Sequence, residues 1–170
     1  MSYDLSTLNE MDRSQFTRAL GDVFEHSPWI ADQVFNSRPF VDIDRLHEAM
    51  VKVVQHTSND KQLDLLQAHP ELAGQEAQKG ELTDASTGEQ SSAGLNALNH
   101  DEMARIAQLN TWYQKKFGFP FIIAVRNHTK QSIFEQWESR LMNDHKTELT
   151  ACLEQVFIIA RIRLETLLQK

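Results

Sequence analysis

The stretch from Asp144 to Leu168, DHKTELTACLEQVFIIARIRLETLL, decides the fold class of this 170-residue chain. Its apolar residues recur at the spacing of an α-helix, which would be roughly 37 Å long at a rise of 1.5 Å per residue. Ile158, Ile159 and Ile162 widen the apolar stripe beyond one face. A stripe of that width indicates contact on two sides, because the helix is central to the monomer or because it also meets a second subunit.

Helical periodicity recurs before this stretch, and each predicted helix begins at a residue type that caps helix N-termini. These positions are Asp12 or Ser14, Ser27 followed by Pro28, Asp42 or Asp44, Asn59, Asn99 with Glu102 in a capping box, and Thr129. The apolar run from Phe119 to Val125 has no helical period and no partner strand elsewhere, which predicts a buried extended or irregular segment. We therefore predict an all-α fold, a single compact multi-helix domain over residues 1–170 with a long C-terminal helix.

Composition narrows the function classes. The formal net charge is −7 and the only adjacent basic pair is Lys115-Lys116, so a nucleic-acid partner is not expected. Cys152 is the single cysteine, which excludes an intramolecular disulfide and fits a reducing compartment. The N-terminal residues lack the pattern of a signal peptide, and no apolar run reaches the roughly 18 residues of a membrane span. We expect a cytoplasmic protein without membrane attachment.

The segment LLQAHPELAG, Leu65 to Gly74, fixes a histidine in place. A helical run reaches His69, and Pro70 disfavours the helical conformation there and supplies no backbone donor, so the helix must stop. The negative end of the helix dipole favours a protonated imidazole, which makes His69 a candidate proton donor. An ordinary capping or half-buried histidine is the alternative, and it is the commoner meaning of an isolated His-Pro pair.

The stretch from Gly74 to Gly94 is small, polar and almost free of large apolar residues, which is typical of a loop. A connection of this length within a small domain is more often functional or disordered than an ordered loop without a role. Ser86 and Glu89 fit a capping box, whose role can be purely local. If Ser86 caps a helix that begins near Thr87, free backbone donors there can bind an anionic substrate, and Glu89 and Gln90 face the same pocket.

Motifs for metals and phosphates do not occur. The seven histidines show no H-x-x-x-H, H-x-H or H-E-x-x-H spacing, so no metal site is expected. No phosphate-binding loop and no G-x-S-x-G motif is found, although a catalytic triad can assemble from distant positions. Arg163 interrupts the apolar stripe of the last helix, and its guanidinium needs an anion or carbonyl groups, because a buried unpaired charge is costly.

Three segments in order resemble one known family. They are Ala68-His69-Pro70; Ser86-x-x-Glu89-Gln90 with Ala93-Gly94-Leu95; and Asn110-x-x-Tyr113-x-x-Lys116-Phe117-Gly118-Phe119-Pro120-Phe121 followed by Ala124-Val125-Arg126. The combination resembles the 2-oxo-4-hydroxy-4-carboxy-5-ureidoimidazoline (OHCU) decarboxylases, which act in urate breakdown. The resemblance covers nearly the full chain, and it is the joint occurrence of the segments that makes it specific.

The resemblance implies an all-helical, cofactor-free homodimer that forms (S)-allantoin from a small-molecule ureidoimidazoline substrate. By this resemblance His69 is the proton donor and Glu89 its catalytic partner. The substrate-binding residues that it implies are Pro70, Ser86, Thr87, Gly88, Glu89, Gln90, Phe121, Ile122, Ile123, Ala124, Val125 and Arg163. The last of these lies in Ile162-Arg163-Leu164, where the family has Leu-Arg-Leu, and Arg126 is the other arginine that can contact the substrate. The peroxisomal signal of some eukaryotic members is absent.

Two other function classes stay open at this point. One is a non-catalytic helical module that binds a partner through residues 74–94. The other is a hydrolase that acts on a related ureide intermediate.

Overall fold

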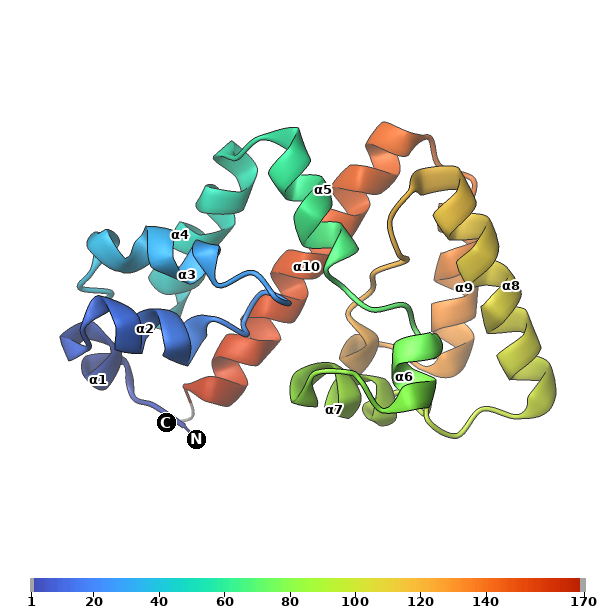
Figure 1. Ribbon diagram of the computed structural model, residues 1–170, viewed down its shortest axis with the longest axis horizontal. Coiled ribbons are helices and arrows are strands. Elements are labelled where there is room, and N and C mark those ends of the chain that lie inside the picture. Colours follow the sequence, from blue (N-terminus) through green and yellow to red (C-terminus); the bar gives the residue numbers. More distant parts are fainter. Residues whose placement is uncertain (1, 169–170) are drawn as a thin grey trace. The chain divides into compact units, whose positions relative to one another are not determined.

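Figure 1 shows the computed structural model, which describes residues 2–168 as helices joined by loops, without a β-strand in that range. The predicted all-α class is therefore confirmed. Contacts between residues divide the chain into two units. We call residues 2–68 with 157–168 the first unit and residues 69–156 the second unit. None of the helices of residues 2–168 has the length and apolar character needed to cross a membrane.

The first unit is built from short helices around a buried aromatic and aliphatic core. Its elements are α1 (Leu5–Glu10), α2 (Arg13–Leu20), α3 (Trp29–Val34), the 3-10 turn η1 (Phe35–Ser37), α4 (Ile43–His56), α5 (Asn59–Gln67) and the C-terminal part of α10 (His145–Leu167). Helix α3 packs against both α2 and α4. Phe16, Ile30 and Met50 are wholly buried between these elements.

Helix starts in this unit partly match the predictions. Asp12, one of the two predicted caps, caps α2 and also forms a capping box with Gln15. Asp42 caps α4 by accepting from the Arg45 amide. The predicted Ser27 cap is wrong, because its hydroxyl donates to the Glu25 carbonyl and Pro28 occupies the cap position without a side-chain bond. Ser58, one residue before Asn59, caps α5.

The second unit contains α6 (Gln75–Lys79), α7 (Asp84–Ser92), α8 (His100–Phe117), the 3-10 turn η2 (Val125–Asn127), α9 (Lys130–Arg140) and the first part of α10. The capping box of Asn99 and Glu102 is confirmed, and Gly118 ends α8 in the left-handed conformation with φ of 79°. Thr129 caps α9 as predicted. The long C-terminal helix is also confirmed, within one residue of its predicted ends.

Residues 74–94 are not the loop that their composition predicts. They contain α6 and α7, and α7 begins at Asp84 with Thr83 as its cap. The Thr83 side chain accepts from the Ser86 amide at 3.2 Å, so Ser86 lies in the first turn and is not the cap. The prediction failed because the buried residues of α7 are Ser86, Glu89 and Gln90, so no apolar period marks the helix.

The run from Phe119 to Val125 is confirmed as a buried irregular segment. All of its residues are buried, and it has no regular structure before η2 begins at Val125. Aromatic side chains hold it in the core, because the Tyr113 ring lies 5.4 Å from that of Phe121, which in turn stacks on Trp137 at 4.4 Å between ring centroids.

Candidate active site

His69 lies in the bend that follows α5. The helix stops at Gln67 with Ala68 as its C-cap, so the predicted helix end before Pro70 is confirmed. The side chain is buried, with 8% of its surface exposed. A buried imidazole beside a rigid proline can be held in one orientation, which a stereospecific proton donor requires.

The loop after His69 is tied to two helices of the second unit. The Asn110 Nδ2 of α8 donates to the Leu72 carbonyl at 3.0 Å. On α7, the Gln90 Oε1 accepts from the Ala73 amide at 2.9 Å. Ala73 has a positive φ of 47°, a conformation that a non-glycine residue keeps only where its surroundings hold it. These bonds fix the chain on the C-terminal side of His69.

The buried face of α7 is polar. Ser86, Glu89 and Gln90 are 4%, 9% and 6% exposed, whereas Thr87 and Gly88 between them are exposed. The Thr87 hydroxyl donates to the Thr83 carbonyl of its own helix. Burying polar side chains is costly unless they are hydrogen-bonded, so a helix stabilised by packing alone would carry apolar residues here. A polar buried face therefore indicates a role in chemistry or binding.

Helix α7 also adjoins the end of the irregular segment. It packs against η2, which begins at Val125. A Cβ atom added at Gly88 would lie 3.7 Å from the Arg126 Nη2, so this arginine approaches α7 at an exposed glycine. The second unit thus brings together three sequence-predicted segments: the loop after His69, the polar face of α7 and the end of the Phe121–Val125 run.

Arg163 belongs to the first unit. Its Nη1 lies 2.7 Å from the Glu25 Oε2 and 3.1 Å from the Asp22 carbonyl oxygen, and its side chain is buried. The expectation that this guanidinium needs an anion or carbonyl groups is confirmed. Its membership of the active site stays a prediction.

No pattern in the sequence indicates the hydrogen-bonding roles of Asn110 and Glu25. Asn110 appears only as part of the family motif, and its spacing from Leu72 carries no signal of their hydrogen bond. Glu25 follows the apolar pair Val23-Phe24, and a carboxylate beside buried residues is the one sign that it needs a cationic partner.

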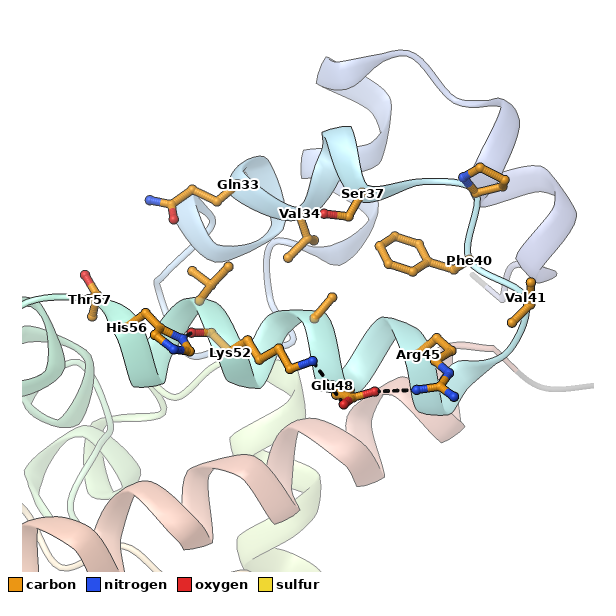
Figure 2. Close-up of a pocket in the computed structure, with 13 residues that line it drawn as sticks. Gln33, Val34, Ser37, Phe40, Val41, Arg45, Glu48, Lys52, His56 and Thr57 are labelled. Atoms are coloured by element: carbon orange, nitrogen blue, oxygen red, sulfur yellow. Dashed lines mark hydrogen bonds and ion pairs between the residues drawn. The ribbon is translucent and has the colours of Figure 1, made fainter.

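Figure 2 shows a pocket on the first unit, between the α3–η1 region and α4. On α4, Glu48 lies between Arg45 and Lys52 and pairs with them at 2.8 and 3.1 Å (Figure 2). A hydrogen bond from Lys52, and to a smaller extent one from Arg45, lowers the pKa of the Glu48 carboxyl. The pocket contains none of the sequence-predicted site residues, and its charged side chains pair with one another.

The bond from Asn110 to Leu72 leads to a stability prediction. Asn110→Ala leaves the buried Leu72 carbonyl without this donor, and we expect the free energy of unfolding to fall by about 1–3 kcal/mol. Urea denaturation measures the change. Thr111→Ala is the matched control, because its exposed hydroxyl donates only to Ala107 of the same helix, and we expect a change within about 0.5 kcal/mol. Equal losses for both variants would contradict the anchoring role.

Glu71 makes stability depend on pH. Burial, and to a smaller extent the Glu76 carboxylate, raises the pKa of the Glu71 carboxyl above its ordinary value of 4.5. The native state therefore holds this proton more tightly than the unfolded state, so stability from this group is lost as pH rises above 4.5. We expect Glu71→Gln to stabilise the protein at about pH 7 by less than about 1 kcal/mol, because the group is partly exposed.

Urea denaturation of Glu71→Gln at about pH 7 and about pH 3 measures this difference, which should vanish at the lower pH, where both states are protonated. Glu81→Gln, at an exposed position, is the control. A gain of equal size at both pH values would contradict the assignment.

Comparison with known proteins gives the family. The model of the OHCU decarboxylase family matches residues 9–165. The chain belongs to the OHCU decarboxylase family. A 2-oxo-4-hydroxy-4-carboxy-5-ureidoimidazoline decarboxylase of Haloferax volcanii is 39% identical over 160 residues, which cover 94% of this chain and 93% of that protein.

Two solved structures are similar to this chain. The crystal structure of an (S)-allantoin synthase is 29% identical, with a TM-score of 0.78, over 96% of this chain and 54% of that chain. The crystal structure of an OHCU decarboxylase in the presence of (S)-allantoin is 20% identical, with a TM-score of 0.70, over 94% of this chain and 100% of that chain. The second similarity supports the fold.

Proposed function

We propose that this chain is a cofactor-independent decarboxylase that converts OHCU to (S)-allantoin in urate degradation. His69 is the stereospecific proton donor and Glu89 its catalytic partner. The observation that carries the proposal is the polar buried face of α7, joined by Gln90 to the loop that follows His69 at 2.9 Å. The family match over residues 9–165 supports it, and related chains are named as OHCU decarboxylases and uric acid degradation proteins.

The reaction suits these residue types. Loss of carbon dioxide breaks the bond to the hydroxyl-bearing ring carbon. Its electron pair forms a double bond to the carbon that bears the ureido group, and the former imine nitrogen takes up a proton from solvent. The Glu89 carboxylate accepts the ring hydroxyl proton as the hydroxyl-bearing carbon becomes a carbonyl. His69 delivers a proton to one face of the carbon that bears the ureido group. Delivery to one face sets the handedness of the product.

The remaining residues bind and orient the substrate. We assign the polar contacts with the ureido group and ring amides to Ser86, Gln90 and the backbone of α7 at Thr87 and Gly88. Pro70 and the segment Phe121, Ile122, Ile123, Ala124 and Val125 form an apolar wall, which favours decarboxylation by solvating the carboxylate weakly. Arg163 is assigned to the substrate carboxylate, beside its own partner Glu25.

A single domain over residues 1–170, a cytoplasmic location and a homodimer complete the proposal. The family match across residues 9–165 supports the single domain. The homodimer is supported by the wide apolar surface of α10, where Ile158 is 39% exposed. Sedimentation equilibrium tests this part, since a mass equal to that of one chain would contradict it.

Product analysis with freshly generated substrate tests the reaction. We expect one carbon dioxide per substrate consumed, no ammonia, and a rate above that of a protein-free control. Ammonia release would instead support a ureide hydrolase. If neither carbon dioxide nor ammonia is released faster than in the protein-free control, the result would support a binding module and contradict the proposed function.

A further inference from the structure

A buried ionic network contacts the segment from Phe121 to Val125, which we call the wall from here on. The Glu148 carboxylate of α10, which is 0% exposed, accepts from the Arg140 Nε of α9 at 2.7 Å and from the Tyr113 hydroxyl at 2.6 Å. Its other oxygen accepts from the Asn143 Nδ2 at 2.9 Å. Burial, and then the adjacent Cys152 and Glu148, raise the pKa of the Tyr113 hydroxyl, which therefore stays protonated as a donor.

The network reaches the backbone of the wall. The Arg140 Nη1 donates to the Ile122 carbonyl at 2.7 Å, and its guanidinium carbon lies 4.4 Å from the centroid of the Phe121 ring. Two residues further on, the Ala124 amide donates to the Gln155 Oε1 of α10 at 3.0 Å. Side chains of α9 and α10 thus hold successive peptide groups on either side of Ile123.

The wall needs such anchors because it is buried without a sheet or helix to pair its backbone groups. A buried ion pair alone is a poor source of stability, since apolar side chains of similar volume often serve as well. Arg140 differs from such a pair in that the same guanidinium binds both Glu148 and a wall carbonyl. Placing a backbone group is therefore a better explanation of this arginine than stability.

The anchors also set the direction of the peptide groups between them. In a trans peptide the carbonyl and the following amide point in opposite directions. With the Ile122 carbonyl directed at Arg140, the Ile123 amide is directed away from that anchor. With the Ala124 amide directed at Gln155, the Ile123 carbonyl is directed away from Gln155. One donor and one acceptor are thereby fixed, and they match the acceptor and donor of a ureido group.

We propose that Arg140 and Gln155 are positioning residues that orient the peptide groups of Ile123 for the substrate. This inference rests on the proposed function, because it takes the wall as part of the substrate site. Neither residue is assigned a contact with the substrate.

Gln155 gives the sharper pair of variants, because it is half-buried and lies outside the ion pair. Gln155→Leu keeps the volume and removes the acceptor, and we expect KM to rise about tenfold with kcat within about twofold, as for loss of uniform binding. Gln155→Glu keeps an acceptor for the Ala124 amide, and we expect KM within about twofold of wild type. An unchanged KM for Gln155→Leu, or an equal rise for both variants, would overturn the proposal.

Arg140→Lys tests the other anchor, because an ammonium keeps the charge beside Glu148 but lacks the fork that also reaches Ile122. Arg105→Lys is its matched control. Arg105 pairs with Glu138 and lies 4.5 Å from the centroid of the Phe134 ring, but it is exposed. We expect KM to rise about tenfold for Arg140→Lys and to stay within about twofold for Arg105→Lys. Equal effects of the two variants would overturn the role of Arg140.

Hydrogen exchange separates this proposal from the proposed function. We expect the Ala124 amide of Gln155→Leu to exchange at least about tenfold faster than in wild type, with no change in Arg105→Lys. An Ala124 amide that exchanges at the wild-type rate would overturn the anchoring. Absence of turnover by the wild-type chain contradicts the proposed function, and the exchange rates then decide the anchoring without any substrate.

Discussion

We expect replacement of His69 with asparagine to lower kcat by about 10²- to 10⁴-fold, the usual loss when a positioned general acid is removed. Asparagine keeps a polar side chain of similar size beside Pro70 but cannot deliver a proton at neutral pH. The product that still forms takes its proton from water on either face of the planar carbon, so it becomes racemic. Steady-state kinetics and chiral chromatography of the allantoin measure the two effects.

His56→Asn is the control for this variant. His56 lies in the last turn of α4, where its Nδ1 is 2.7 Å from the Lys52 carbonyl oxygen, and it is exposed. We expect wild-type kinetics and chirality from it. Unchanged production of (S)-allantoin by His69→Asn would contradict the role of His69 as the stereospecific donor.

The second large effect is expected for Glu89→Gln, with kcat lowered by about 10²- to 10⁴-fold. The amide preserves the shape of the side chain and most of its hydrogen-bonding capacity, so the buried face of α7 stays packed. It cannot accept the proton that the ring hydroxyl releases. Steady-state kinetics with freshly generated substrate measure the loss.

Asp84→Asn provides the comparison on the same helix, because Asp84 is exposed in the first turn of α7. Thermal unfolding should give similar midpoints for the two variants, which separates catalysis from folding. A Glu89→Gln variant with wild-type kcat would show that this carboxylate takes no part in proton transfer.

Much of the fold could be predicted because its local signals agree with its packing. Asn99 and Glu102 mark the start of α8, Gly118 marks its end, and apolar residues at helical spacing lie between them. The irregular nature of Phe119–Val125 was predictable by elimination, because no other segment offered a partner strand. His69 was predictable as a fixed imidazole, because Pro70 restricts the backbone directly.

Helix α7 was not predictable, for the same reason that makes it a candidate site. Its buried positions carry Ser86, Glu89 and Gln90. Buried residues therefore recur at helical spacing, but they are polar, so no apolar residues recur at that spacing. Ser86 and Glu89 also imitate a capping box, which moves the apparent helix start by three residues from Thr83. Local conflict of this kind is expected at functional positions.

The pairing of side chains that are distant along the chain could not be predicted from the sequence either. Arg163 could be recognised as a buried arginine in need of an anion, but Glu25 is 138 residues away along the chain. Arg140 and Glu148 lie on different helices, and nothing in their spacing predicts that their network reaches Ile122. Such partners are fixed by tertiary packing, whereas capping and periodicity are fixed within a few residues.

The handedness of the allantoin formed by the wild-type chain tests the central claim most directly. Circular dichroism of the reaction with freshly generated substrate follows it without separation of the products. We predict a signal of (S)-allantoin alone that grows in proportion to the amount of enzyme. A racemic product formed at the rate of a protein-free control would contradict the assignment of this chain as a stereospecific decarboxylase.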